Sequence, residues 1–346
     1  FIKLAPVVEE LNKLGKKQII IHTGQHYDFN MSDIFFDELN IPSPDENLNI
    51  GSGTHAEVTG NAMIALEKTI QKYEPQLVLV YGDTNSTLAG ALASRKLNYQ
   101  LCHIEAGTRS YNKKNPEETN RVIVDHISDI LFCPDRISVQ NLANEGITEN
   151  VFFSGDVMED VFNRTKDSDE GLNIIKEKGL KTNQYFLMTW HRQENTDSIE
   201  SLCNIISLIE EIPKPILCPL HPRTKNILER TGLIKKVLEL KNLVCIEPVG
   251  YKEMVTLNRN SCGIICDSGG LSKEAYYAGK KCLFMLELNV WPDLFENGWM
   301  KQYTRNADRY LLVEWLLGEN APQKEEDFYG NGVAAQRIVA ELAKFL

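Results

Sequence analysis

GIICDSGGLSKEAYYAGKKCLFMLE, residues 263–287, is the stretch of sequence that decides the fold. It contains two short apolar runs, at its two ends, with a segment of helical composition between them. This pattern predicts a strand–helix–strand unit of a parallel sheet. Two adjacent glycines, Gly269 and Gly270, stand where the first strand becomes the helix. Because glycine has no side chain, the turn favours the close approach of another group to the backbone.

The same alternation of apolar strands and helical segments continues through the chain. In the first half, the predicted strands are 17–24, 77–83, 100–106 and 150–156, with helices at 56–73, 86–97 and 117–130. In the second half, the predicted strands are 185–191, 215–221, 242–249, 263–270 and 281–287, with helices that include 198–212 and 250–260. The polar stretch NRTKDSDEG, 163–171, is the best linker candidate between the halves.

Two such series predict an α/β protein with two doubly wound, Rossmann-like domains that face each other across a cleft. We expect an N-terminal domain over residues 1–165, a C-terminal Rossmann-like domain over 172–330, and a final helix, 331–346, that packs back across the junction. The chain opens on a helix, FIKLAPVVEELNKLG, with no strand before it. An α/β domain normally begins with a buried strand, so we expect the first strand to be missing from this sequence.

Composition excludes several classes of function. The chain has 346 residues and a net charge of −11, which argues against nucleic-acid or membrane binding by bulk charge. No apolar run approaches the length of a membrane span. The eight cysteines form no CxxC pair, so we expect free thiols in the cytoplasm and no metal site. Serine-elbow, Walker, GxGxxG and HExxH motifs are absent from the sequence, which disfavours hydrolase, kinase, NAD-dependent and zinc-protease chemistry.

Polar residues follow the predicted strands of the second half, where doubly wound folds bind ligands. Ser268, Gly269 and Gly270 begin a helix whose free N–H groups can bind phosphate oxygens; the alternative is an ordinary helix cap. Glu274, one turn along, can bind ribose hydroxyls; the alternative is a solvent-facing glutamate. His191, in HRQEN, can contact a phosphate or protonate a leaving group, or simply cap its loop.

A second anion contact is possible in HPRT, where His221 and Arg223 can bind a ligand or stabilise their own loop.

The first half contributes acidic residues. Asp83, in GDTNST, can act as a base or substrate anchor, or cap the following helix. Glu105, in HIEAG, is a candidate acid or base, or a partner of a nearby cation. Glu117 and Arg121 are four residues apart on one predicted helix face, where they can also form a routine ion pair.

Taken together, these segments resemble the UDP-N-acetylglucosamine 2-epimerase family over essentially the whole chain. The motifs that carry the resemblance are HTGQHYD (22–28), YGDTNSTLAG (81–90), HIEAGTRS (103–110), PEETNRVIVDHISD (116–129), WHRQENTDS (190–198), HPRT (221–224) and DSGGLSKEA (267–275). The resemblance implies the two-domain GT-B fold of nucleotide-sugar glycosyltransferases. It also implies that members begin with a strand and a GTRPE loop, which this sequence lacks.

The resemblance implies a reaction without metal or cofactor, in which UDP is eliminated across C1–C2 of the sugar and adds back after C2 is reprotonated from the other face. It further implies site roles, residue by residue. Asp83, Glu105 and Glu117 would form the acid/base group with Arg121 orienting one of them, and His191 would contact the diphosphate. The UDP contacts implied are Ser268, Gly269 and Gly270 at the β-phosphate, Glu274 at the ribose, and Lys3 and Pro248–Met254 near the nucleotide.

The expected partner is a UDP-sugar, and the resemblance implies a homodimer through the first domain. The leading hypothesis is a cytoplasmic enzyme that makes UDP-ManNAc from UDP-GlcNAc for surface polysaccharide. The alternatives are a 2-epimerase of UDP-2,3-diacetamido-uronic acid, a hydrolysing relative that releases ManNAc, a glycosyltransferase of the same fold and a nucleotide-sugar sensor.

Three departures from the family pattern matter. Asn289-Val290-Trp291 replaces the usual TERPE or TEW segment, which puts the sugar contacts in question. Tyr27-Asp28 and Thr54 replace residues that accompany activation by a second substrate molecule, so we do not expect that activation. The HRxENTD and HPRT motifs are shared with relatives that act on diacetamido-uronic nucleotides, so these motifs do not decide which sugar is the substrate.

Overall fold

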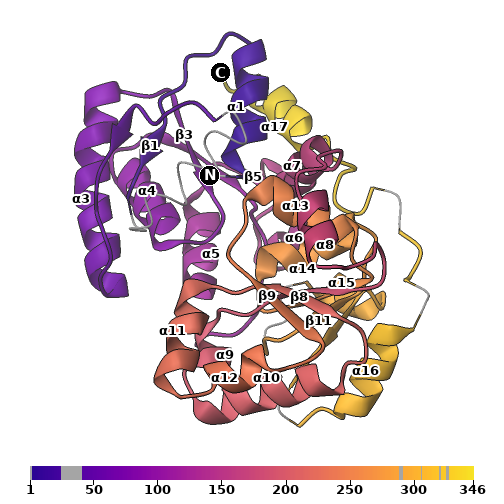
Figure 1. The fold of residues 1–346 in the computed structure, drawn as a ribbon. Coiled ribbons are helices and arrows are strands. Elements are labelled where there is room, and N and C mark those ends of the chain that lie inside the picture. The colour runs from indigo at the N-terminus through magenta and orange to yellow at the C-terminus, as the bar shows by residue number, and fades with distance from the viewer. Residues whose placement is uncertain (1, 25–40, 288–290, 305, 319–320, 325–326) are drawn as a thin grey trace. The chain divides into compact units, whose positions relative to one another are not determined.

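The structure, a computed structural model, describes residues 2–24, 41–287, 291–304, 306–318, 321–324 and 327–346. It divides into two compact units, of which unit 1 comprises Phe1–Val161 and Glu325–Leu346, and unit 2 comprises Phe162–Lys324 (Figure 1). The chain leaves unit 1 within helix α7 (Val157–Thr165), where the sequence analysis placed the end of a domain at 165 and a linker at 163–171. Residues 331–346, expected to bridge the junction, belong to unit 1.

Unit 1 is built on a parallel sheet with the strand order β3–β4–β5–β6. These strands are β3 (Leu77–Tyr81), β4 (Gln100–Ile104), β5 (Ile130–Cys133) and β6 (Val151–Phe153), and a separate parallel pair is formed by β1 (Ile21–His22) and β2 (Glu46–Asn47). The other helices are α1 (Leu4–Lys13), α3 (His55–Tyr73), α4 (Asn85–Lys96), α5 (Pro116–Ile127), α6 (Arg136–Asn144) and α17 (Ala334–Leu342). The sequence analysis missed β5, because the helix predicted at 117–130 extends into its first residue, Ile130.

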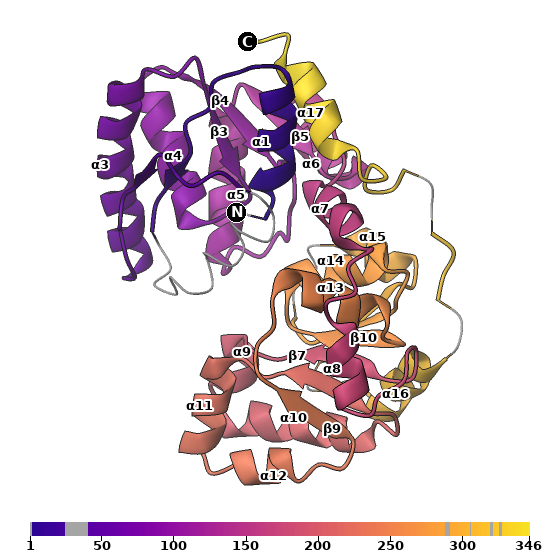
Figure 2. The same cartoon turned by 45° about the horizontal axis from the view of Figure 1, so that its top comes forward.

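Local sequence explains where the helices of unit 1 begin and what they cover. Asn115 caps α5 through its side chain and Pro116 occupies the first turn, where a missing N–H costs nothing. Helices α1 and α17, from opposite ends of the sequence, lie side by side (Figure 2). Val7 and Leu11 of α1 and Ile338 of α17 share one core with strands β4 and β5. The two chain segments of unit 1 are therefore joined by apolar burial.

Unit 2 contains a parallel sheet with the strand order β12–β11–β10–β7–β8–β9. Its strands are β7 (Phe186–Thr189), β8 (Ile216–Pro219), β9 (Leu243–Ile246), β10 (Gly263–Cys266), β11 (Cys282–Phe284) and β12 (Met300–Gln302). Its helices are α8 (Leu172–Glu177), α9 (Gln193–Thr196), α10 (Ile199–Glu211), α11 (Pro222–Arg230), α12 (Ile234–Leu238), α13 (Tyr251–Arg259), α14 (Gly269–Tyr277), α15 (Pro292–Glu296) and α16 (Arg309–Leu317).

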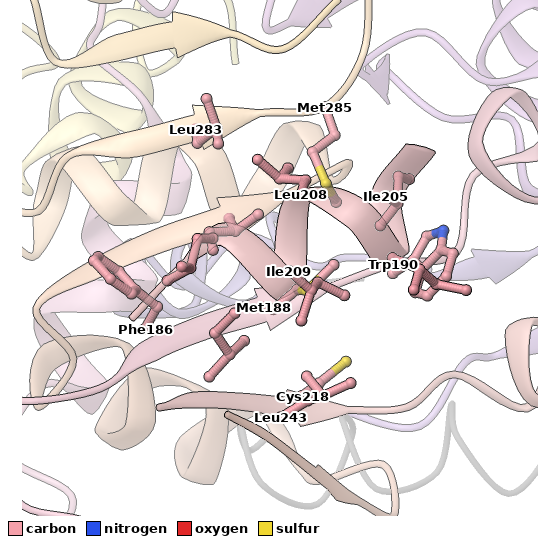
Figure 3. Packing of buried hydrophobic residues seen from close by; sticks show 14 of the residues in the cluster. Phe186, Met188, Trp190, Ile205, Leu208, Ile209, Cys218, Leu243, Leu283 and Met285 are labelled. Carbon is pink, nitrogen blue, oxygen red and sulfur yellow. The ribbon is translucent and has the colours of Figure 1, made fainter. Parts of the chain in front are cut away.

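This strand order is the doubly wound Rossmann order, which runs outward in both directions from β7 and β10. β7 and β10 are paired in parallel, with Thr189 opposite Cys266, so their carboxyl ends lie together at the topological switch point. Ile205, Leu208 and Ile209 of α10 pack with the sheet residues around Phe186 and Met188 (Figure 3). This apolar core fixes the strands whose ends carry the candidate site.

The predicted α/β class with two Rossmann-like units is confirmed by the parallel sheets. None of the helices in the described ranges is both long and apolar enough to cross a membrane.

Candidate active site

The Ser268–Gly270 turn lies at the carboxyl end of β10, on the switch point of unit 2. Ser268 is the N-cap of α14, and its hydroxyl accepts a hydrogen bond from the N–H of Leu271 at 3.4 Å. A methyl group built on Gly269 would meet no atom within 4 Å, and one on Gly270 would meet only Ser268 Oγ at 3.9 Å. Neither glycine is in the left-handed region, so neither internal packing nor backbone conformation requires glycine here. The two uncrowded glycines are the first residues of α14, and a helix N-terminus suits an anion such as a phosphate.

Asp267, directly before that turn, links the end of β10 to the segment after β7 through side-chain hydrogen bonds. Its side chain is fully buried, and Oδ2 accepts hydrogen bonds from the backbone N–H groups of His191 and Arg192, both at 2.8 Å. Asn195 donates to the same oxygen at 3.2 Å. Oδ1 lies 2.9 Å from Nδ1 of His191. The carboxylate therefore positions both the backbone and the ring of His191.

His191 presents its second nitrogen outward from this contact. Its side chain is 32% exposed, its ring lies 5.5 Å from that of His221, and Nε2 has no partner among the described residues. Burial opposes ionisation of Asp267, but the contacts from His191 and Arg192 outweigh burial and lower the pKa of the carboxyl. An ionised aspartate behind a histidine holds the ring with one nitrogen available to a ligand.

The other candidates of unit 2 divide into buried and exposed positions. Glu274 is buried, so the alternative of a solvent-facing glutamate is wrong. His221 caps α11 by accepting from the N–H of Arg223 at 3.1 Å. Arg223 pairs with Asp197 at 2.6 Å, a contact that stabilises its own loop. Pro248 lies in the exposed loop after β9, and Met254 is half-buried on α13.

Glu105 follows β4 and forms an ion pair with Lys3, the N-cap residue of α1. Its backbone has φ +74°, in the left-handed region that a glutamate rarely adopts. Gly82, at the end of the neighbouring strand, has φ +63°, and a methyl group built on it would lie 3.3 Å from Glu105 Oε2 and 3.8 Å from Lys3 Nζ. The Gly82 backbone is thus packed directly against the ion pair. Strain of this kind is typical of functional sites.

Arg121 connects Asp83 to α5. Its Nη2 and Nε lie 2.6 Å and 3.0 Å from Asp83 Oδ2, and its Nη1 lies 2.9 Å from Glu118 Oε2. The routine ion pair between Glu117 and Arg121 does not form. Glu117 is half-buried, and its carboxylate has no hydrogen bond or ion pair within the described part of the chain.

Glu118, which the sequence analysis passed over, is the buried partner of Arg121. It accepts hydrogen bonds from Ser110 and Tyr111. Burial raises the pKa of Glu118, but these hydrogen bonds and Arg121 outweigh burial and lower it. The signal was its position three residues before Arg121 on the same helix face.

Other missed residues form a buried polar chain under the strand ends of unit 1. Asp125 of α5 accepts from Arg109 at 2.6 Å and lies 2.6 Å from His103 Nδ1. Arg109 also makes a two-pronged contact with Glu145 at 2.7 Å and 2.8 Å. His103 and Arg109 stand in the same HIEAGTRS motif as Glu105, so the signal was present in the sequence.

The departures from the family pattern are described only in part. Gln25 to Asp28, Asn289 and Val290 lie outside the described residues. Trp291 is buried, with Lys273 Nζ 4.0 Å from the centre of its ring. Thr54 is the N-cap of α3, where it forms a capping box with Glu57. Its role in the described structure is therefore to start a helix.

A Rossmann-like unit with an open glycine turn, together with a second α/β unit that carries carboxylates at its strand ends, defines the GT-B-like class of nucleotide-sugar proteins. The sequence matches the UDP-N-acetylglucosamine 2-epimerase family over residues 9–343. The chain belongs to that family and is an epimerase, hence an isomerase.

Relatives of known name support this membership. A UDP-N-acetylglucosamine 2-epimerase homolog of Methanococcus maripaludis is 48% identical over 99% of this chain and 96% of its own length. A UDP-2,3-diacetamido-2,3-dideoxy-D-glucuronate 2-epimerase of Pseudomonas aeruginosa is 44% identical over 99% and 96%. The crystal structure of the Methanocaldococcus jannaschii UDP-GlcNAc 2-epimerase, in complex with UDP-GlcNAc and UDP, has a TM-score of 0.89 and 40% identity, covering 99% of this chain and 96% of that one.

Proposed function

We propose that this chain interconverts UDP-GlcNAc and UDP-ManNAc, with unit 2 binding the diphosphate and unit 1 transferring protons at C2 of the sugar. The observation that carries the proposal is the Gly269–Gly270 turn. Two glycines that neither packing nor backbone conformation requires stand at a helix N-terminus on a Rossmann switch point. The likeness to a structure in complex with UDP-GlcNAc and UDP supports the choice of ligand.

The proposed chemistry balances without a cofactor. A carboxylate removes the C2 proton, the C–H electrons form the C1=C2 double bond, and the C1–O bond to UDP breaks to leave 2-acetamidoglucal and UDP. Re-addition of UDP at C1 takes a proton onto C2 from the opposite face, which inverts that centre. His191 stabilises the negative charge that develops on the departing diphosphate, together with the α14 N-terminus.

Unit 1 offers carboxylates in three different environments for the two proton transfers. Asp83 is held by Arg121, Glu105 by Lys3, and Glu117 has no partner within the described residues. We assign Glu105 and Glu117 to proton transfer at C2, because Arg121 already binds the Asp83 carboxylate through two nitrogens to one oxygen. Asp83 then serves as a fixed anchor for the sugar.

Incubation with UDP-GlcNAc alone in D₂O tests the proposed function. We expect NMR to show deuterium at C2 in both UDP-GlcNAc and UDP-ManNAc, with the sugar still attached to UDP. Free ManNAc and UDP would identify a hydrolysing enzyme instead. Absence of exchange with UDP-GlcNAc would refute the leading assignment.

The second candidate substrate is a UDP-2,3-diacetamido-2,3-dideoxyuronic acid. The 44% identity to the Pseudomonas aeruginosa enzyme of that name equals the 44% identity to a UDP-N-acetylglucosamine 2-epimerase of Methanococcus maripaludis, so sequence identity supports both sugars. The same D₂O assay with both sugars, run in competition, decides between them by the ratio of kcat/KM values.

We also propose that the enzyme is a cytoplasmic homodimer. The eight cysteines are free thiols, which fits a reducing compartment. Light scattering behind a sizing column measures the oligomeric state, and a monomer mass would refute the dimer.

A further inference from the structure

His103, which lies on β4 two residues before Glu105, is a buried group that the proposed chemistry does not use. Its side chain is 1% exposed. Its Nδ1 lies 2.6 Å from Asp125 Oδ1, and its Nε2 lies 2.8 Å from the carbonyl oxygen of Gly82. The two ring nitrogens therefore contact oxygen atoms on opposite sides of the ring.

Hydrogen-bond chemistry determines the state of the ring. A backbone carbonyl can only accept, and an ionised carboxylate can only accept, so each ring nitrogen must carry a hydrogen. Asp125 is ionised because Arg109 donates to its second oxygen at 2.6 Å and the N–H of Gly107 donates at 3.0 Å. Although burial opposes its ionisation, His103 and Arg109 lower the pKa of Asp125. The ring of His103 is then an imidazolium ion, balanced within a row of alternating charges that continues to Glu145.

The Gly82 carbonyl gives this charge a role at the site. Gly82 is held from β4 at both ends, because its N–H donates to Ile104 at 3.0 Å and its carbonyl accepts from His103. Its Cα lies against the Glu105–Lys3 pair, and the next residue is Asp83. The tether therefore fixes the Gly82 peptide, and with it the spacing between the Asp83 and Glu105 side chains.

We propose that His103 is a positioning residue, which holds the Gly82–Asp83 turn in register with Glu105 for proton transfer at C2. This inference rests on the proposed function for its kinetic consequence, but not for the charge state. His103 touches no substrate in the proposal and acts through the Gly82 carbonyl.

Two substitutions separate the two contacts of the ring. In His103→Asn, the side-chain amide replaces Nδ1 and can keep the Asp125 contact, while the tether to Gly82 is lost. In His103→Gln, the amide reaches the position of Nε2 and keeps the tether. We expect His103→Asn to lower kcat on the order of 100-fold, the effect of displacing a reacting group by about 1 Å, with unchanged affinity for UDP. His103→Gln should retain most of the kcat.

Ser94→Ala is the matched control, because Ser94 is also fully buried in unit 1 and donates to a backbone carbonyl, that of Gly90, at 2.7 Å. We expect it to lose stability without a selective loss of kcat. Equal kcat in the Asn and Gln variants would overturn the proposal, as would equal losses of kcat and UDP affinity.

NMR of the wild-type protein labelled with ¹⁵N-histidine tests the charge without any variant. Because each ring nitrogen faces an acceptor oxygen, both ring nitrogens of His103 should show the shifts of nitrogens that carry hydrogen. Loss of the signal in His103→Gln assigns it to His103. A neutral tautomer would overturn the proposal. If the wild-type chain exchanges the C2 hydrogen of neither UDP-sugar, the proposed function is wrong. The NMR result then still decides the charge of His103.

Discussion

The strand ends of the two units use opposite means to build a site. In unit 1, side chains form the site: Glu105 pairs with Lys3, and Asp83 pairs with Arg121. The backbone at Gly82 and Glu105 is in the left-handed region. In unit 2, the backbone forms the site: Gly269 and Gly270 have ordinary conformations and leave open the space that a side chain would fill at the start of α14. A side-chain site suits proton transfer, whereas a backbone site suits a bound anion. Substitutions can therefore separate chemistry from binding.

Glu105→Gln should have the largest effect. It removes one of the two carboxylates assigned to proton transfer and lowers C2 deuterium exchange on the order of 1,000-fold. The affinity for UDP, measured by calorimetry, should be unchanged because the diphosphate is assigned to unit 2. Glu149→Gln, at an exposed position of unit 1, is the control and should exchange normally. Loss of UDP binding in Glu105→Gln would contradict the assignment of proton transfer to unit 1 and of diphosphate binding to unit 2.

Asp267→Asn tests the buried support of the unit 2 site. We expect the free energy of unfolding to fall by about 2 kcal/mol near pH 7, because an amide faces the N–H groups that the carboxylate accepted from. All four tryptophans lie in unit 2, so their fluorescence in urea reports this unit.

The pH dependence of that loss follows from the lowered pKa of Asp267. The ionised carboxylate stabilises the fold above the unfolded-state pKa of about 3.9, and this contribution disappears as the pH falls through the lower folded-state pKa. The difference between wild type and variant should therefore shrink below about pH 4. A difference that stays constant down to acid unfolding would contradict this assignment.

Gly269→Ala combined with Gly270→Ala tests the backbone site itself. The methyl groups meet no crowding from the protein, so the fold should be unchanged or up to about 1 kcal/mol more stable, since alanine favours a helix. UDP affinity should fall roughly 10- to 100-fold, as expected for the loss of hydrogen bonds to a charged group.

The matched control for the double alanine variant is Gly279→Ala, which also meets no atom within 4 Å but has φ +69°. It should lose about 1 kcal/mol of stability and bind UDP normally. Unaltered UDP binding in the double variant would show that no anion approaches this turn.

Thr54→Ala should have the smallest effect. Loss of the capping box of α3 should lower stability by about 1 kcal/mol, seen as faster hydrogen exchange in the first turn of α3. Kinetics should be unaltered and show no activation by a second substrate molecule. Sigmoidal kinetics in the wild type that Thr54→Ala abolishes would show that Thr54 does more than cap a helix.

The sequence predicted the α/β class because buried parallel strands are continuous apolar runs, and those runs correspond to β1, β3, β4, β6 and β7–β11 in the structure. It missed β5, whose first residue lies at the end of the helix predicted at 117–130, and two strands with few apolar residues, β2 (Glu46–Asn47) and β12 (Met300–Gln302). The sequence predicted the type of sheet but not the order of its strands, because pairing between segments that are distant in the chain has no local sequence pattern.

The candidate site was predictable where a polar residue ends an apolar strand, as for Asp83 and Glu105. The partners were not: Arg121 pairs with Asp83, 38 positions away, rather than with the glutamate four positions before it. His103 and Asp267 were equally visible in the sequence, but their importance depends on burial, which only the fold reveals.

The discontinuity of unit 1 has a consequence for how the protein is made. Helix α17 supplies Ala334, Ile338 and Leu342 to the core that also contains Val7 and Phe132, yet the ribosome adds these residues only after all of unit 2. Unit 2 is continuous and can fold while the chain is still growing. The apolar face of α1 and the sheet of unit 1 therefore stay exposed while the 163 residues between Val161 and Glu325 are synthesised. Nascent chains stalled before α17 should therefore bind chaperones through unit 1 and not through unit 2.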